Sequence, residues 1–278
     1  MQLEEFQFIN HYIHVCLIRE NQKMINIMLQ LEKEVTNFIQ RFKHQDNIQY
    51  DDKEGACTVL ETFKAIVELA LPINVVCSKA WVENSVEPDS YTVSDVIQSY
   101  KGTNVETLNT DAEGRLILAD AMSYAQHKFL IQEMIKLSTF AGIIKNALGS
   151  YCRVFTKRKG CYSLLQKVQK INKEPFWQLP VDDQHRFLIK GSVADINTSS
   201  SVRVGASAAA TFLEYFVEKK VRWIHWDIAN VAVSDKNEGI YNKGETGFGV
   251  MSLIYYMTWD IVSKERNEQK QENDEDDN

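Results

Sequence analysis

The chain has 278 residues, 44% of them hydrophobic, which is enough for one large α/β domain or for two small domains. Its formal net charge of −7 argues against nucleic acid or an anionic membrane as a partner, because such partners usually bind a basic surface. No apolar run approaches the ~20 residues of a membrane span, and the N-terminal residues resemble neither a secretory signal nor a transit peptide. Five scattered cysteines without a CxxC pair favour a reducing, cytoplasmic compartment.

The first 54 residues contain neither glycine nor proline. From Met24 to Phe42 the apolar residues are three or four positions apart, the spacing of one helix face, which predicts a helix over 24–42. Upstream, the stretch YIHVCLI is rich in β-branched and aromatic residues and suits a strand, although so short a run does not separate strand from helix. Residues 1–47 are interpreted as a divergent first segment of the domain that follows.

From Gly55 onward, helical and strand-like patterns alternate, as they do in proteins built on a parallel sheet. The predicted fold is α/β with three layers, a twisted and mostly parallel sheet between helices. Residues 263–278 are charged and rich in acids, so we expect a disordered tail. The predicted helices cover 56–71, 115–129 and 206–220, and the predicted strands cover 73–77, part of 129–138 and 223–228.

The stretch NTDAEGRLILADA, residues 109–121, places two acids and an arginine directly before a helical pattern. If residues 109–113 are extended, Asp111 and Glu113 point to the same side and can share one site, since carboxylates are ligands of Mg²⁺, Mn²⁺ and Zn²⁺. Gly114 then opens the turn into a helix, and Arg115 at the N-terminus of that helix favours an anion. The alternative is that both acids simply cap the helix, and spacing alone favours this alternative.

The sequence NTDAEGRL followed by an apolar helix resembles the signature of the leucyl (cytosol) aminopeptidase family. Other stretches resemble further conserved segments of that family, over about residues 48 to 260, and a catalytic domain is therefore assigned to 48–262. The resemblance does not include the family's separate N-terminal domain. The stretches are DDKEGACTVL, LPINVV, VENSVEPDSYTVSDVI, FWQLPVDD, WIHWDIAN and KGETGFG.

The resemblance implies a metal-dependent peptidase that assembles as a hexamer, a dimer of trimers, and acts on peptides. Position by position, Asp52, Asp111 and Glu113 match metal ligands for one or two Zn²⁺ or Mn²⁺ ions. Arg115 matches the arginine that holds a carbonate acting as general base.

The resemblance fails where the family has a glycine-rich loop that carries two more ligands and a catalytic lysine. In an alignment without gaps from Asp52, the lysine ligand falls on Leu29, the aspartate ligand on Glu34 and the catalytic lysine on Arg41. Of these three residues, only Glu34 retains a ligating group. If the alignment shifts, Lys43 takes the place of Arg41 as the catalytic lysine. A loop that curls around two ions commonly needs glycine, which this segment lacks.

Two further departures affect the predicted site. Glu54 replaces the first glycine of the family's Gly-Gly pair, and it is either a substitute ligand or a charge that spoils the site. The predicted substrate pocket also differs from the family pattern, because its leucine is Phe140 and its second threonine is Ala141; its residues are Thr139, Phe140, Ala141 and Gly142.

These residues support two interpretations: a degenerate family member that serves as an assembly subunit, and an active aminopeptidase that uses Asp52, Asp111 and Glu113. Other candidates are weaker. His11 and His14 lie three residues apart but have no acidic or cysteine partner nearby, and His225 is interpreted as a packing residue. Ser138 has no His and Asp in a recognisable order, which argues against serine catalysis.

Overall fold

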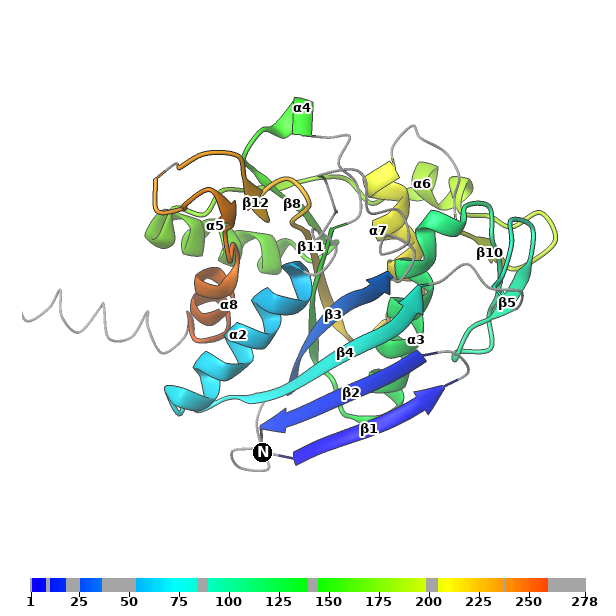
Figure 1. The fold of residues 1–278 in the computed structure, drawn as a ribbon, viewed down its shortest axis with the longest axis horizontal. Coiled ribbons are helices and arrows are strands. Elements are labelled where there is room, and N and C mark those ends of the chain that lie inside the picture. The colour runs from blue at the N-terminus through cyan, green and yellow to red at the C-terminus, as the bar shows by residue number, and fades with distance from the viewer. Residues whose placement is uncertain are drawn as a thin grey trace, which may run out of the picture.

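An eight-stranded sheet forms the centre of the protein in a computed structural model, in the order β1-β2-β4-β3-β7-β11-β8-β9 (Figure 1). Strands β4, β3, β7 and β11 run parallel to one another, whereas the pairs β1–β2, β2–β4 and β11–β8 are antiparallel and β9 runs parallel to β8. The structure describes residues 2–8, 11–18, 26–36, 54–84, 90–139, 145–198, 205–237 and 239–259. The strands are β1 (Gln2–Phe8), β2 (His11–Ile18), β3 (Asn26–Thr36), β4 (Asn74–Asn84), β7 (Glu133–Ser138), β8 (Cys152–Phe155), β9 (Phe176–Gln178) and β11 (Arg222–Asp227).

Helices cover both faces of this sheet, which gives three layers (Figure 1). Strand β7 shows the division, since Met134 packs with the helices of one face while Ile135 and Leu137 pack with those of the other. The Met134 face carries α3 (Glu113–Lys128) and α7 (Gly205–Tyr215). The opposite face carries α2 (Glu54–Glu68), α5 (Lys159–Asn172) and α8 (Val250–Met257). The predicted three-layer α/β fold is confirmed, with antiparallel strands added toward the edges of the sheet.

Two small sheets and two short helices complete the described structure. Strands β5 (Val96–Gln98), β6 (Asn104–Glu106) and β10 (Ile196–Asn197) form a three-stranded sheet that leads into the 109–113 segment. Strands β12 (Val233–Ser234) and β13 (Gly244–Glu245) form a two-stranded sheet. Helices α4 (Lys145–Leu148) and α6 (Asp183–Leu188) lie in connections. Across the described residues, every helix is too short or too polar to cross a membrane.

The predicted helix over 24–42 is wrong in its described part, because residues 26–36 form β3. Met28 is paired with Val76 of β4 and with Met134 of β7, so residues 27–30 of this strand are paired on both edges, and the rest of the strand is paired with β4. Strands inside a parallel sheet carry apolar residues almost continuously, and such a run imitates the spacing of a helix face. Residues 37–42 lie outside the described residues, as do residues 260–278 with the predicted disordered tail.

The other predicted elements are confirmed. The stretch YIHVCLI lies within β2, and 73–77 begins β4. The helix predicted over 206–220 is α7, which ends earlier, at Tyr215, where the chain turns toward β11. The prediction of α3 is correct in type, but the helix begins at Glu113 and not after Gly114.

Candidate functional site

Helix α2 begins directly against the carboxyl end of β7. A Cβ atom added to Gly55 would lie 3.4 Å from the carbonyl oxygen of Leu137 and 3.6 Å from the Cα of Ser138, which are ordinary van der Waals distances, so the first turn of α2 packs directly on the end of β7. The preceding Glu54 is buried, with 6% of its surface exposed. The start of α2 and the predicted pocket residue Thr139, which follows β7, therefore lie at the same edge of the sheet. The predicted ligand Asp52 lies outside the described residues.

The segment before α3 is a short 3-10 helix, η2 (Thr110–Ala112), and not an extended strand. Asn109 caps η2, because its side chain accepts a hydrogen bond of 3.1 Å from the backbone N–H of Asp111. The expectation that Asp111 and Glu113 point the same way from an extended chain is therefore wrong. The side chain of Asn109 favours η2 over an extended segment. An Asn directly before a helix accepts hydrogen bonds from backbone N–H groups that an extended chain would pair with a neighbouring strand.

The two carboxylates differ in their surroundings. Asp111 is exposed, whereas Glu113 is half-buried in the first turn of α3. Burial raises the pKa of Glu113, and the effect is opposed by hydrogen bonds from the backbone N–H groups of Glu113 and Gly114 and by the positive charge of Arg115. Glu113 therefore lies in the first turn of its helix, at the positive end of the helix dipole, but burial disfavours its charged form.

Arg115 links the start of α3 to the small three-stranded sheet. Its guanidinium Nη1 donates a hydrogen bond to the carbonyl oxygen of Thr198, which follows β10. Thr198 is itself held by β6, since its N–H donates to the carbonyl of Glu106 over 3.0 Å. Part of the guanidinium thus has a structural contact, and its predicted role toward a carbonate stays a prediction.

Tyr91 lies beside this turn and was not among the residues that the sequence singled out. Its hydroxyl lies 3.3 Å from the carbonyl oxygen of Thr110, to which it donates. Burial, and to a lesser extent the charge of Asp111, raises the pKa of Tyr91 to about 12, so the phenol stays protonated. The only signal in the sequence is the position of Tyr91 inside the stretch VENSVEPDSYTVSDVI.

Two of the predicted metal ligands, Asp111 and Glu113, lie within the described residues. Asp111 and Glu113 offer the carboxylate oxygens that Mn²⁺ and Mg²⁺ prefer. Among the side chains that the structure describes, no group of three or more His, Cys, Asp or Glu residues is arranged to hold a metal ion. The remaining predicted residues, Asp52, Phe140, Ala141 and Gly142, lie outside the described residues, and for Glu34 the structure gives the backbone only, opposite Val82.

A pocket of about 390 Å³ lies at the start of α2, between that helix and the loop after β13. Glu54, the possible substitute ligand, lines this pocket together with Glu61 and Glu245. Thr58 ties the two sides together, because its hydroxyl donates to the carbonyl oxygen of Phe248 over 3.1 Å. The pocket is acidic and suits a cationic group.

Comparison with known proteins identifies the family. The model of the cytosol aminopeptidase family, catalytic domain, matches residues 40–254. The chain belongs to this family. A probable cytosol aminopeptidase of Aquifex aeolicus is 39% identical over 208 residues, which are 74% of this chain and 42% of the relative. One from Clostridium tetani is 36% identical over 207 residues, 74% of this chain and 43% of the relative. The chain therefore spans less than half the length of these relatives.

Solved structures show the same fold. A mutant of tomato leucine aminopeptidase has a TM-score of 0.78 and 28% identity, over 89% of this chain and 47% of its own. The bottromycin maturation enzyme BotP in complex with Mn has a TM-score of 0.79 and 25% identity, over 89% of this chain and 55% of its own. The family and the fold inferred from NTDAEGRL are therefore correct.

Within this aminopeptidase-family domain, a buried polar layer lies beneath α3 and α7 that the sequence did not reveal. His225 stacks between Phe155 and Trp223, with ring centroids 5.6 and 6.2 Å away. Its Nε2 lies 3.4 Å from the Oγ of Ser138. Burial first, and then the nearby cation of Lys136, lowers the pKa of His225 well below its ordinary value, so the ring is neutral. All these side chains are buried, which supports the interpretation of His225 as a packing residue.

The same layer contains an ion pair between Arg153 and Asp227. The guanidinium Nη2 lies 3.3 Å from the Oδ1 of Asp227, and both side chains are fully buried. Strand pairing sets this contact, because Arg153 of β8 and Ser138 of β7 are both paired with Asp227 of β11. The structure thus brings Ser138, His225 and Asp227 together, but inside the protein and without access to a substrate.

Proposed function

We propose that this chain is a degenerate member of the cytosol aminopeptidase family, with weak or no peptidase activity, that acts as a structural or assembly subunit. One observation carries the proposal. The acids and the arginine of NTDAEGRL are retained, whereas the position that corresponds to the lysine ligand is Leu29, in the middle of β3. Leu29 is paired with Cys77 of β4 and with Ile135 of β7. A leucine in a strand that is paired on both sides offers no donor to a metal or to a substrate.

The loss of the lysine ligand weighs most against catalysis. A cationic side chain near the scissile carbonyl stabilises the charge that develops on the oxygen, and its removal typically costs orders of magnitude in rate. The alignment replaces the lysine ligand with Leu29, whereas Arg41 in place of the catalytic lysine keeps a positive charge but not the shape of a lysine. A retained contact of Arg115 with Thr198 explains why Arg115 would persist without catalysis.

The alternative is an active metal-dependent aminopeptidase that releases residues such as leucine from the N-termini of peptides. Asp52, Asp111 and Glu113 would hold one or two Zn²⁺ or Mn²⁺ ions, and Glu34 or Glu54 would replace a lost ligand. A bound ion would supply Lewis-acid polarisation of the peptide carbonyl and a hydroxide nucleophile. Arg115 would position the general base, and Thr139 with residues 140–142 would line the substrate pocket.

The same proposal includes self-association and a cytoplasmic location. The family resemblance favours a homo-oligomer, either a hexamer built as a dimer of trimers or a part of a larger assembly. The acidic surface and the absence of a basic footprint in the composition favour neither nucleic acid nor membrane as a partner.

Hydrolysis of a leucyl chromogenic amide, with added Mn²⁺ or Zn²⁺, tests the proposal when Glu113→Ala serves as the blank. We expect no turnover above that blank from the folded protein, and turnover well above it would establish the active alternative. Calorimetric titration with Mn²⁺ on both proteins adds a second readout. Binding to the parent chain but not to Glu113→Ala, without turnover, would show that the metal site is retained and that the missing lysines cause the loss.

A further inference from the structure

Two cysteines face each other where the β1–β2 hairpin joins the central sheet. Cys16 of β2 is the ladder partner of Cys77 of β4 in an antiparallel pair of strands. Among the ladders of the described residues, this is the one position where two cysteines are partners. The register of the two strands therefore brings together two thiol-bearing residues that lie far apart in the sequence.

The spacing of an antiparallel ladder is compatible with a disulfide at this position. Residues that are directly opposite have Cα atoms about 4.5 or 5.5 Å apart, depending on whether the pair is hydrogen-bonded. Both distances lie within the range of about 4.4–6.8 Å that disulfides span between Cα atoms. Opposite residues of such a pair also share one face of the sheet. A bridge between positions 16 and 77 therefore needs no large movement of the backbone.

Cys77 lies on the face of the sheet that α2 covers. It is fully buried and belongs to the same apolar cluster as Val75 and as Val59 and Phe63 of α2, whereas Val76 belongs to the cluster on the other face. Cys77 is reduced in the structure. Because a buried thiol is inert toward large reagents, oxidation at this position requires a small oxidant and a local opening of the sheet.

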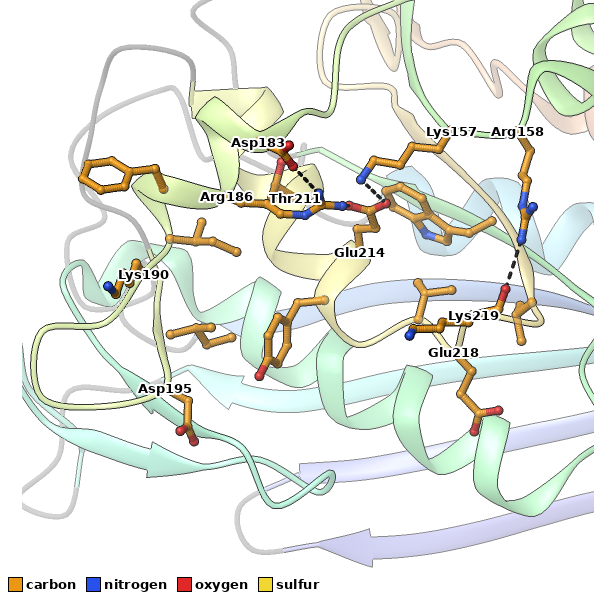
Figure 2. A pocket seen from close by; sticks show the side chains of 17 residues that line it. Lys157, Arg158, Asp183, Arg186, Lys190, Asp195, Thr211, Glu214, Glu218 and Lys219 are labelled. Carbon is orange, nitrogen blue, oxygen red and sulfur yellow. Dashed lines mark hydrogen bonds and ion pairs between the residues drawn. The ribbon is translucent and has the colours of Figure 1, made fainter.

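The β1–β2 hairpin is attached to the protein differently from α6 and α7. Ion pairs join those two helices to each other and to the turn after β8, because Lys157 and Arg186 both pair with Glu214 (Figure 2). The hairpin is joined to the rest of the sheet by the ladder of β2 with β4 (Figure 1). Elements at the rim of a fold open locally at a lower free energy than its core. Such opening gives a small oxidant access to position 77.

We propose that Cys16 and Cys77 form a reversible disulfide when the protein is exposed to a hydroperoxide, and that this bridge fastens the β1–β2 hairpin to β4. One thiolate attacks an oxygen of hydrogen peroxide, the O–O bond breaks and hydroxide leaves, which gives a sulfenic acid. The second thiolate attacks that sulfur, the S–O bond breaks and a second hydroxide leaves. In total the two thiols lose two protons and two electrons, and the peroxide is reduced to two water molecules.

The bridge is consistent with the reducing compartment that the cysteine pattern predicts, because disulfides in such compartments are usually transient and redox-sensing. Its covalent loop encloses residues 17–76, which include β3, α2 and the segment that replaces the family's glycine-rich ligand loop. Closing so long a loop removes conformational freedom from the unfolded chain, so the oxidised protein should unfold at a higher temperature. The proposal is independent of whether the domain is an active peptidase.

Mass spectrometry of the non-reduced protein tests the pairing. The folded protein is treated with hydrogen peroxide, the remaining thiols are blocked with N-ethylmaleimide, and trypsin is added without reductant. Cleavage after Arg19, Lys64 and Lys79 should release residues 1–19 joined to residues 65–79, and dithiothreitol should separate the two peptides. The proposal is overturned if both peptides carry maleimide after excess peroxide has oxidised the exposed Cys57, or if either is joined mainly to another cysteine.

Two serine variants separate this bridge from general oxidation. Cys16→Ser should lose the rise in the thermal unfolding midpoint that peroxide causes in the parent protein. Cys57→Ser is the matched control, since Cys57 is exposed and lies outside the ladder of β2 with β4, and it should keep both the joined peptides and the rise. In concentrated urea, which removes the strand register, the joined peptides should become one product among several. An equal rise in Cys16→Ser, or the same single product in urea, would overturn the proposal.

Discussion

Helices α8 and α3 each begin beside a glutamate, but the two glutamates have different surroundings. At α8 the acid is Glu174, which is distant in sequence and almost fully buried. Its Oε1 accepts hydrogen bonds from the hydroxyl of Tyr241 over 3.0 Å and from the N–H of Gly249 over 2.9 Å. Its Oε2 accepts from Asn172 over 3.2 Å and from both the N–H and the hydroxyl of Ser252.

At α3 the acid is Glu113, the first residue of the helix itself. Its hydrogen bonds come from the first N–H groups of its own helix, and Arg115 contributes only through its charge. Burial raises the pKa of Glu113, so the folded protein disfavours its ionised form. The family resemblance places a metal ligand at this residue and none at Glu174.

The comparison separates two uses of a buried acid. A carboxylate that is saturated by donors, such as Glu174, stabilises the fold and has no capacity left for a ligand. A carboxylate with few donors, such as Glu113, costs stability in its charged form and is the one that a cation would stabilise. Substitutions at the two helices should therefore change stability in opposite directions.

The largest effect is expected for Glu174→Ala. Several buried donors lose their acceptor, at about 1–3 kcal/mol each, so the free energy of unfolding should fall by at least about 3 kcal/mol. Urea denaturation measures the change, and Glu174→Gln should restore part of it because the amide oxygen still accepts. A loss below about 1 kcal/mol would show that α8 does not depend on this cap.

A smaller loss is expected at the other end of α8, for Tyr256→Phe. The hydroxyl of Tyr256 donates to Glu133 Oε1 over 2.6 Å, while Arg222 holds Oε2 at 2.7 Å and remains in place. Removal of one bond to a charged group should cost about 1.5–3 kcal/mol in denaturant unfolding. Tyr255→Phe is the control on the adjacent residue and should leave stability unchanged; equal losses in both variants would refute the role of the hydroxyl.

The smallest effect, with the opposite sign, is expected for Glu113→Gln. Because the folded pKa of Glu113 lies above its ordinary 4.5, its contribution to stability is complete below pH 4.5 and is lost as the pH rises through the folded pKa. Thermal unfolding in EDTA should therefore give similar stabilities for the two proteins at pH 4 and a higher stability for the variant at pH 7. A variant that is less stable at pH 7 would mean that Glu113 is saturated in the way Glu174 is.

Most of the fold was predictable because the local patterns agree with the tertiary contacts. The apolar face of 56–71 and the strand-like 223–228 behave as α2 and β11. The pattern over 24–42 failed because pairing on both edges of β3 outweighs a helical spacing of apolar residues. Short-range periodicity does not report such long-range pairing.

For the candidate site, the sequence identified the family, and the structure corrects the local geometry of the motif. NTDAEGRL identified the family, and the comparisons confirm that identification. The cap formed by Asn109 converts the predicted extended segment into η2, and so changes how Asp111 and Glu113 are presented. The hydroxyl of Tyr91 contacts Thr110 only in the folded protein, because nineteen positions of sequence separate the two residues.

The sequence alone determined the family, the alternation of helices and strands, and the acids available at the start of α3, because each depends on residue types at fixed local spacing. Only the tertiary structure decided that residues 26–36 form a strand, that Glu174 and not a local residue caps α8, and that Lys136, Arg153, His225 and Asp227 share one buried layer. These features depend on contacts between residues tens of positions apart, and their energies arise only when the sheet has assembled.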